Sequence, residues 1–502
     1  MRILQGVYDV VWGAPALILI LLVGLYLTVR THFLQLRLLP RAGIAFCRRL
    51  SGKESAGDGV SSFQALCTAL AATVGTGNLA GVAGAIAIGG PGAIFWMWLC
   101  GILGMIIKFA EATLAVRYRV RLPNGEYVGG PMYMIRLGLP NQLRPLAGIY
   151  AFFGVVAAFG VGNATQINTM ITGIGETAAI FGYCLPSGWK LLLGLLLAAL
   201  LGSMLLGGAK RIGQTAEFLV PFAAAVYLVL CVAVLLLRWN FLDDAFAAIL
   251  HGVHDPLAVT GGVVGSAAVA LRTGVSRGVF TNEAGMGTAS MAHASATVSH
   301  PVEQGMMGIV EVFLDTILIC TMTALVILCS GIPIPYGLDA GIALTTAAFS
   351  CVLGPWVSLL ITISLCLFAL ATVLGWGLYG IRCAQYLFGP DAWKRIVYLQ
   401  ILAVAVSAVL KAETVWLAAE ILNGLMAIPN LITLWVLTPE LIHIYKSYFH
   451  GGNYENFHQR QSLCILSHAY VPPAGCGSAG SRQEDLSSEY RPAGSEDAGS
   501  IL

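Results

Sequence analysis

The chain has few charged residues and lacks the motifs of most enzymes and nucleic-acid-binding proteins. Asp, Glu, Lys and Arg make up 10 % of its 502 residues, against about 25 % in a soluble domain. No C-x-x-C pair, Walker A string or nucleophile motif occurs, His251 and His254 fall in a predicted loop, and His293 is isolated. The net charge of +2 comes without a basic, aromatic-rich cluster, so no nucleic-acid partner is expected. We expect neither an enzyme nor a bound cofactor.

Long apolar runs fill the sequence instead. Hydrophobic residues make up 57 % of it, and a membrane span needs about 20 apolar residues. Eleven such runs predict an all-α polytopic protein of the lipid bilayer. The first run lacks a cleavage site and precedes Arg30, so we count it as a span and not as a signal peptide. The expected spans are 10–29, 63–87, 91–112, 148–170, 190–207, 217–237, 259–292, 306–330, 352–380, 395–411 and 413–436.

Basic residues collect in alternate loops, and cytoplasmic loops are the basic ones. With the N-terminus outside and the C-terminus in the cytoplasm, the only basic residues of the outer loops are Lys190, Arg238 and Lys411. The same loops hold Asp243, Asp244 and Asp255. The cytoplasmic segments hold Arg30, Arg37, Arg41, Arg48, Arg49, Lys53, Arg117, Arg119, Arg121, Arg136, Arg144, Lys210, Arg211, Arg382, Lys394 and Arg395.

Ten spans remain when the first is set aside, five on either side of residue 250. Because five is odd, the second set enters the membrane in the opposite orientation, which predicts an inverted five-plus-five repeat behind one extra helix. Residues beyond Gly451 are rich in Gly, Ser, Pro and Glu and cannot bury enough apolar surface to order. The expected parts are an N-terminal helix and cytoplasmic loop (1–62), the first repeat (63–250), the second repeat (251–440) and a disordered cytoplasmic tail (441–502).

Glycine interrupts the first span of each repeat. AATVGTGN occupies 71–78 and FTNEAGMG occupies 280–287. A break frees backbone groups that hydrocarbon cannot satisfy, so it is tolerated only in a cavity or inside protein. Two breaks at matching places in two halves point to the substrate site of a secondary transporter. The alternative is that these glycines only allow close helix packing.

The breaks carry groups that suit a small zwitterion and a cation. Free N–H groups at a half-helix end attract a carboxylate, and free carbonyls suit a hard cation such as Na⁺. Thr73 and Thr76 add hydroxyls, and Asn78 adds an amide. Glu283 lies in the second break beside Asn282, where a carboxylate is costly and marks function by default. It faces a substrate ammonium, neighbours the cation or carries a proton, or else it caps the second half-helix.

Other polar residues in the spans give weaker signals. Gln166 shares a helix face with Asn163 and is expected to reach the cavity, whereas Asn168 points elsewhere. Lys108 and Glu111, three residues apart, suggest a structural ion pair. Glu311 and Asp315 lie one turn apart, so one is protonated or each has its own partner. The default for Thr372 is a hydroxyl bonded to its own helix, and for Trp376 it is packing.

Several long strings resemble the alanine/glycine:cation symporters. The similarity covers roughly residues 8–440. The strings are GTGNLAGV (75–82), GGPGAIFWMW (89–98), KFAEATLAV (108–116), GGPMY (129–133), RGVFTNEAGMG (277–287), HPVEQG (300–305) and DT (315–316).

The resemblance implies a leucine-transporter-type fold and uptake of alanine or glycine with Na⁺ across the plasma membrane, the inner membrane in a bacterium. It implies a Na⁺ site made of carbonyls of the first broken helix and a hydroxyl of the eighth core helix. The matching positions are Ala71, Val74, Ala369 and Thr372. Substrate contacts are implied at Thr73, Gly75, Thr76, Gly77, Asn78, Gln166, Asn282, Glu283, Gly285 and Trp376.

Three positions depart from the family. Ala371 stands where a Ser is common, WGLYGI at 376–381 replaces a frequent WSYYGE, and Thr273 replaces a usual Trp. The first two lie near the expected cation site and leave an H⁺-coupled symporter as the alternative. A channel is the less favoured alternative, because no repeated selectivity-filter ring occurs.

The expected substrate is small. Bulky Phe280 and Trp376 flank the proposed cavity, and an added methylene that overlaps such a wall costs about 1–3 kcal/mol, or roughly tenfold or more in affinity. Leucine and phenylalanine should therefore compete poorly with labelled alanine for uptake. If leucine competes as well as alanine does, the small-substrate expectation is wrong, and Thr273→Trp is the next variant to measure.

Overall fold

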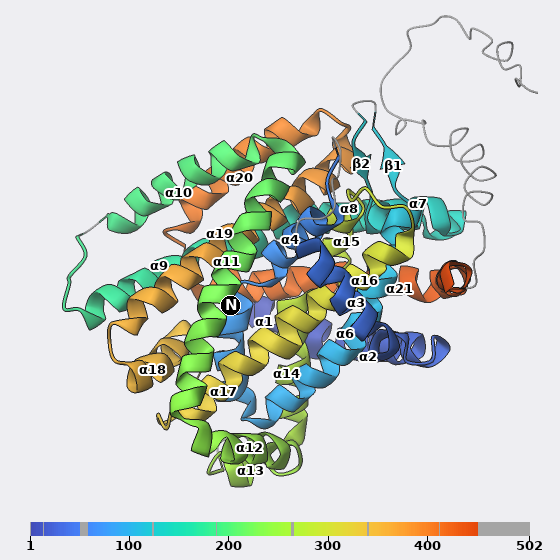
Figure 1. Ribbon diagram of the computed structural model, residues 1–502. Coiled ribbons are helices and arrows are strands. Elements are labelled where there is room, and N and C mark those ends of the chain that lie inside the picture. The colour runs from blue at the N-terminus through green and yellow to red at the C-terminus, as the bar shows by residue number, and fades with distance from the viewer. Residues whose placement is uncertain are drawn as a thin grey trace, which may run out of the picture. The chain divides into compact units, whose positions relative to one another are not determined.

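The computed structural model describes residues 2–13, 15–50, 59–122, 125–186, 188–262, 266–338, 341–410 and 412–449 (Figure 1). All of them belong to one compact unit, Met1–Gly452. Helices dominate because a backbone that lies in apolar surroundings must satisfy its polar groups within each segment. The predicted tail lies outside the described residues from 450 onward, whereas residues 441–449 are helical.

The described residues of the first half of the chain form sixteen elements. They are α1 (Arg2–Gly13), α2 (Pro15–Arg30), α3 (Leu34–Leu50), α4 (Ser62–Thr73), η1 (Gly77–Gly81), α5 (Val82–Gly89), α6 (Gly92–Arg117), β1 (Val120–Arg121), β2 (Tyr127–Val128), α7 (Pro131–Gly138), η2 (Asn141–Leu143), α8 (Pro145–Ala157), η3 (Ala158–Ala164), α9 (Thr165–Ile180), α10 (Trp189–Leu205) and α11 (Gly208–Leu237). β1 and β2 form an antiparallel hairpin in which Val120 pairs with Val128.

The named elements of the second half are all helices over its described residues. Its elements are η4 (Trp239–Phe241), α12 (Leu242–His254), α13 (Pro256–Val259), α14 (Ala267–Asn282), α15 (Thr288–His293), α16 (Pro301–Val312), η5 (Phe313–Cys320), α17 (Thr321–Cys329), α18 (Gly341–Leu353), α19 (Val357–Phe388), α20 (Ala392–Ser407) and α21 (Ala412–Phe449).

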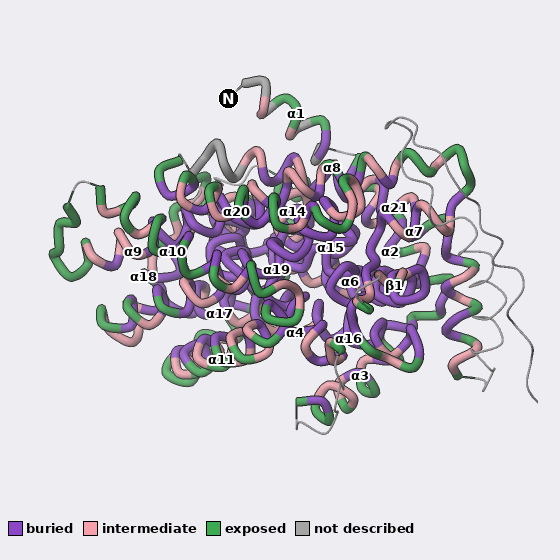
Figure 2. Tube along the Cα trace, turned by 90° about the horizontal axis from the view of Figure 1, so that it is seen from above, coloured by how far each residue is buried: buried purple, intermediate pink, exposed green. Residues whose placement is uncertain are grey.

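Burial separates inner from outer helices. Figure 2 shows α6, α15 and α19 largely buried, with exposed faces on α10 and α11. The exposed faces are apolar: Leu196 is 60 % exposed, Val229 67 % and Phe218 74 %. Large apolar side chains facing outward over whole helices are typical of a surface that contacts lipid.

Six helices of the described chain are long and apolar enough to cross a membrane, or eight if each bent helix pair counts as one span. One of these pairs, 15–30 with 34–50, bends by 80°. Helices coincide with each of the eleven predicted runs, although the seventh begins only at Ala267. α10 has 17 residues and α20 has 16, which is short for a span. The count of eleven therefore stays a prediction.

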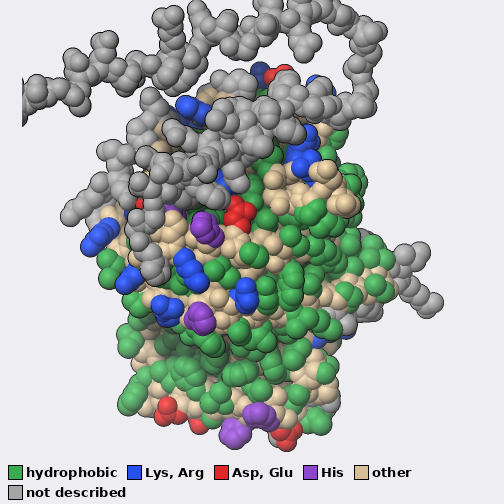
Figure 3. Space-filling view, turned by 90° about the vertical axis from the view of Figure 1, so that its right-hand side faces the viewer, with side chains coloured by type: hydrophobic (Ala, Val, Ile, Leu, Met, Phe, Trp, Pro, Cys, Tyr) green, Lys and Arg blue, Asp and Glu red, His purple; other side chains and the backbone are tan. Residues whose placement is uncertain are grey.

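Charged groups differ between the two ends of the molecule. α12 and α13 lie at one end and the β1–β2 hairpin lies toward the other (Figure 1). Figure 3 shows acidic and histidine side chains at the end of α12, a broad hydrophobic surface, and Lys and Arg side chains nearer the opposite end. This separation agrees with the direction of the predicted loop-charge bias.

Both predicted breaks occur where the glycines are. α4 ends at Thr73 and η1 begins at Gly77, with a bend of 48° between the two halves. α14 ends at Asn282, where Glu283 adopts φ 54° and Gly285 adopts φ 93°. Only glycine enters this left-handed region without strain, so Glu283 is held there by its surroundings. Such strain is concentrated at functional sites.

Three π-helical segments, η1, η3 and η5, lie at the level of the breaks, and η1 packs against η5. A π segment widens the turn and often marks a functional position. It also shifts which residues share a face. Asn163, in η3, donates to the carbonyl of Gln400 on α20 and does not accompany Gln166, so the predicted shared face is wrong.

Candidate functional site

The two breaks lie against each other. A Cβ placed on Gly77 would lie 3.0 Å from Cγ2 of Thr281 and 3.3 Å from Cδ1 of Phe280, on the last turn of α14. Gly77 is therefore needed for this approach. A bulky side chain there would press on α14 as well as on any ligand.

Asp315 and Thr316 of η5 join the two breaks. Asn78 Nδ2 donates to Asp315 Oδ1 at 2.7 Å, and Asn282 Nδ2 donates to Thr316 Oγ1 at 3.1 Å. Thr316 Oγ1 in turn donates to Asp315 Oδ2 at 2.8 Å. The predicted site residues Asn78 and Asn282 are thus brought together, through a pair of residues on a third helix.

The first break is closed by its own side chains. Gly75 N–H, which an uninterrupted helix would give to the Ala71 carbonyl, donates to Asn78 Oδ1 at 2.8 Å. Thr76 Oγ1 donates to Gln166 Oε1 at 3.1 Å, so Gln166 reaches the break as predicted. The hydroxyl of Thr73 bonds back to its own helix, to the Ala69 carbonyl at 3.3 Å.

The predicted cation ligands lie on facing turns of α4 and α19. A Cβ on Gly75 would lie 2.5 Å from Oγ1 of Thr372. One turn on, a Cβ on Gly375 would lie 2.8 Å from the backbone nitrogen of Ala72. The hydroxyl of Thr372 donates to the Phe368 carbonyl at 3.0 Å, which is the bond to its own helix that was expected by default. Its oxygen still faces the break and can accept or ligate there. Ala71, Val74 and Ala369 are fully buried beside it. Carbonyl and hydroxyl oxygens are ligands that suit a hard cation.

Glu283 is fully bonded without a basic partner. Its Oε1 accepts from Trp376 Nε1 at 2.7 Å and its Oε2 accepts from Thr288 Oγ1 at 2.5 Å. Trp376 is therefore more than packing. The carboxylate of Glu283 contacts no backbone N–H of α15, so the alternative in which Glu283 caps this half-helix is not seen. The free N–H groups of the break, just before α15, are bound by another residue.

That residue is Glu111 of α6. Its Oε1 accepts from Gly285 N at 2.9 Å, from Gly287 N at 3.0 Å and from Asn430 Nδ2 at 2.7 Å. The carbonyl of Gly285, a predicted substrate contact, also accepts a hydrogen bond from Asn430 Nδ2. Glu111 Oε2 is buried and has no hydrogen-bond partner among the described residues.

Lys108 does not pair with Glu111, so the predicted ion pair between them is wrong. Lys108 Nζ lies 2.9 Å from Glu311 Oε1, with both side chains fully buried. His293 Nε2 donates to Glu311 Oε2 at 2.9 Å, and Gln304 Nε2 donates to His293 Nδ1 at 2.7 Å. Asp315 bonds Asn78 and Thr316 instead. Glu311 and Asp315 therefore have separate partners, which was one of the two expectations for this acidic pair.

The network extends to the start of α4, since Ser62 Oγ donates to Gln304 Oε1 at 2.6 Å. His293 was judged isolated in sequence, but in the fold it links α15 to α16. Lys108, Glu311 and His293 together tie α6, α16 and α15 into one group with α4.

Thr273, where the family usually has Trp, lies away from the breaks. It packs against Gly89 at the end of α5 and precedes Asn282 by nine residues, a rise of about 13 Å along α14. A direct effect of this departure on substrate size is therefore not supported by its position.

These features define a class of protein: a helical membrane transporter with two discontinuous helices around a buried polar site. The structure superposes on MhsT in complex with L-phenylalanine with a TM-score of 0.53 at 16 % identity, covering 76 % of this chain and 98 % of that one. The fold is therefore of the leucine-transporter type.

The chain belongs to the sodium:alanine symporter family, whose model matches residues 1–460. An uncharacterised transporter of Haemophilus influenzae is 44 % identical, covering 92 % of this chain and 99 % of that protein. Sodium/alanine symporter AgcS of Methanococcus maripaludis is 41 % identical, over 89 % and 96 %. Probable sodium/glutamine symporter GlnT of Bacillus subtilis is 38 % identical, over 88 % and 89 %. The family is one of membrane transporters and not of enzymes.

Removing the cap from the second break should destabilise the protein. Glu111→Leu leaves the N–H groups of Gly285 and Gly287 without an acceptor, at a cost of about 1–3 kcal/mol each. Glu111→Gln keeps an acceptor oxygen and should lose much less. Thermal unfolding of the protein in detergent measures both, and equal unfolding temperatures for Glu111→Leu and the unaltered protein would contradict the capping role.

Filling the gap between α4 and α19 should impair the cation site. Gly75→Ala places a methyl group 2.5 Å from Oγ1 of Thr372, so the hydroxyl has to move. We expect the cation concentration for half-maximal uptake to rise about tenfold, roughly 1.4 kcal/mol. Gly81→Ala is the matched control, because its Cβ meets nothing within 4 Å. Equal cation dependence in the two variants would refute the assignment.

Proposed function

We propose that this protein is a secondary active symporter that imports a small neutral amino acid, alanine or glycine, together with Na⁺ by alternating access. The family description and the name of the AgcS relative support sodium and alanine. The observation that carries the proposal is the pair of broken helices that meet at one buried polar site between α6, α9, η5 and α19.

The buried side chains around this site carry more carboxylates than basic groups, which favours binding of a cation. Glu111, Glu283, Glu311 and Asp315 are all buried, and of these only Glu311 contacts a basic side chain of the described chain, Lys108. An unpaired buried carboxylate is strongly disfavoured. Na⁺, the substrate ammonium or bound protons would supply the missing positive charge.

The two poles of an amino acid have separate partners in the proposed complex. Glu283 accepts the ammonium, which takes the place of the Trp376 and Thr288 donors. The carboxylate takes the Gly75 N–H, where Asn78 Oδ1 now lies, and approaches the N-terminal end of η1 across Gly77. Thr76 and Gln166 complete the wall, with Asn282 and Gly285 on the opposite break.

The Na⁺ ligands in this proposal are the carbonyls of Ala71, Val74 and Ala369 and the hydroxyl of Thr372. No cofactor is required. The close approach of Gly75 to Thr372 supports this arrangement, because it brings the end of α4 against the middle of α19. A Na⁺ here would hold α4 and α19 together, so both substrate binding and the packing of these two helices would depend on the ion.

The proposed topology has eleven spans, one extra helix and two inverted sets of five, with the N-terminus outside and the C-terminus in the cytoplasm. The ends of the molecule differ in charge in the sense this topology requires (Figure 3). α4–α5 and α14–α15 are then the first helices of the two repeats, which accounts for why both are broken.

The runner-up is a H⁺-coupled symporter of the same substrates. The favouring observation is that three of the four buried carboxylates lack a basic partner among the described residues, so each is a candidate for a proton. The size of the substrate is the second open point, because one relative is named a probable sodium/glutamine symporter.

One experiment tests the coupling. Proteoliposomes containing the full chain should accumulate labelled alanine or glycine under an inward Na⁺ gradient, and not under a H⁺ gradient alone. Thr372→Ala should raise the Na⁺ concentration for half-maximal uptake, because it removes a ligand oxygen. Thr372→Ser, which keeps the hydroxyl, serves as the control. Accumulation driven by H⁺ alone, with an unaltered Na⁺ response in Thr372→Ala, would establish the runner-up instead.

A further inference from the structure

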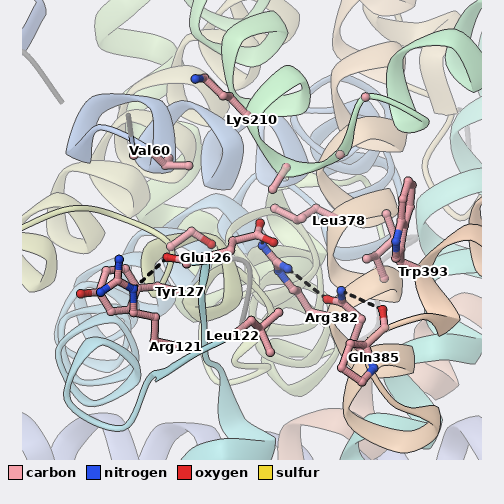
Figure 4. Close-up of a pocket in the computed structure, with 18 of the residues that line it drawn as sticks. Val60, Arg121, Leu122, Glu126, Tyr127, Lys210, Leu378, Arg382, Gln385 and Trp393 are labelled. Atoms are coloured by element: carbon pink, nitrogen blue, oxygen red, sulfur yellow. Dashed lines mark hydrogen bonds and ion pairs between the residues drawn. The ribbon is translucent and has the colours of Figure 1, made fainter. Parts of the chain in front are cut away.

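A cavity of about 980 Å³ lies on the face that carries the basic loops (Figure 4). Its wall is formed by the segment before α4, the β1–β2 hairpin, the segment after α15, the α10–α11 turn, the last turns of α19 and the start of α20. The first and third segments adjoin the broken helices, the hairpin follows α6, and the others belong to the helices around them. The cavity therefore separates two groups of helices.

α19 runs from the broken-helix site to this cavity. Trp376 on α19 donates to Glu283 in the second break, whereas Leu378 and Arg382 line the cavity. Arg382 follows Trp376 by six residues, a rise of about 9 Å along the helix. A substrate that leaves the breaks toward this face would enter the cavity beside Arg382.

Arg382 has an incompletely used guanidinium. Its side chain is only 2 % exposed. Nη2 donates to Glu126 Oε1 at 2.5 Å and Nη1 donates to Gln385 Oε1 at 3.0 Å, as Figure 4 shows. Nε is buried and has no hydrogen-bond partner in the described part of the chain. Nε and Nη2 point the same way and form the fork that takes a carboxylate through two parallel bonds, so Glu126 holds only one half of that fork.

Glu126 belongs to the opposite side of the cavity. It precedes β2 in the hairpin, and Arg119, beside β1, donates to the Ala296 carbonyl just beyond α15 at 2.5 Å. Arg119 also lies over the ring of Tyr127, 4.0 Å from its centroid. The hairpin is thus attached to the second broken helix, and the Arg382–Glu126 ion pair crosses the cavity from that helix to α19.

We propose that Arg382 is a carboxylate-binding residue of a release subsite in this cavity. The carboxylate of the departing amino acid binds Nε and Nη2 of Arg382 and displaces Glu126, which breaks the tie between the hairpin and α19. When the amino acid leaves, Glu126 returns to Arg382. Arg121, Lys210 and the acidic Asp391 also line the cavity and take no part in this subsite. This subsite rests on the proposed amino-acid transport.

The test compares the two faces of the membrane. Uptake of labelled alanine into intact cells measures half-saturation at the outer face, and uptake into everted vesicles measures it at the inner face. Arg382→Gln should raise the inner-face value about tenfold or more and leave the outer-face value unchanged. Arg382→Lys keeps the charge without the fork and should lie between. Glu126→Gln weakens the competitor and should lower the inner-face value several-fold.

Lys210→Gln is the matched control, since Lys210 lines the same cavity and should leave both values unchanged. Equal shifts at the two faces, or a change for Lys210→Gln as large as for Arg382→Gln, would overturn the subsite. So would a rise of the inner-face value in Glu126→Gln. Amino-acid flux that does not saturate in the unaltered protein would overturn the proposed function, and this inference with it.

Discussion

The second break depends on one contact, the carboxylate of Glu111. Gly285 and Gly287 leave the helical ladder at membrane depth, where an unsatisfied N–H group costs several kcal/mol, and both donate to Glu111 from another helix. The first break is satisfied locally, because Asn78 bonds Gly75 three residues away. In the proposed complex a substrate carboxylate replaces Asn78, whose amide also bonds Asp315, whereas the loss of Glu111 would leave two N–H groups of the second break without an acceptor. The two breaks are therefore unequal: the acceptor of the first comes from its own segment, and that of the second comes from α6.

The polar contacts also divide the helices into two groups. Ser62, Gln304, His293, Glu311 and Lys108 form one continuous chain through α4, α16, α15 and α6. The breaks are joined to α9 and α19 by individual hydrogen bonds, Thr76 to Gln166 and Trp376 to Glu283, whereas Asn430 of α21 bonds both Glu111 and Gly285. Breaking the inner chain would leave buried charges unpaired, at a cost far above that of one hydrogen bond. Relative motion would therefore be cheapest between this group and the pair α9 and α19, where the proposed substrate site lies.

The features that the sequence predicted well are local ones. Glycines in an apolar run and the intramembrane Glu283 identify the breaks without knowledge of the fold, and family strings support the fold itself. The partners of Glu111 and Lys108 were not predictable, because 174 residues separate Glu111 from Gly285, and helix spacing favoured the nearer Lys108. The π turn of η3 redirected Asn163. The role of Asn430 was not predictable. A single amide in a long apolar helix looks the same in sequence whether it binds a neighbouring helix or the backbone on the lipid-facing side of its own helix.

α19 carries the proposed cation ligands, one wall of the proposed substrate site and part of the cavity, so the departures along it lie at different places. Gly377, where the family often has Ser, packs against Leu205, since a Cβ there would lie 2.5 Å from that side chain. This position faces α10 and not Thr372, so it bears on helix packing and not on ion ligation. Ile381, where the family often has Glu, lines the cavity beside Arg382. With no acid at that position, the carboxylate that holds Arg382 comes from Glu126 of the hairpin, on the opposite wall of the cavity.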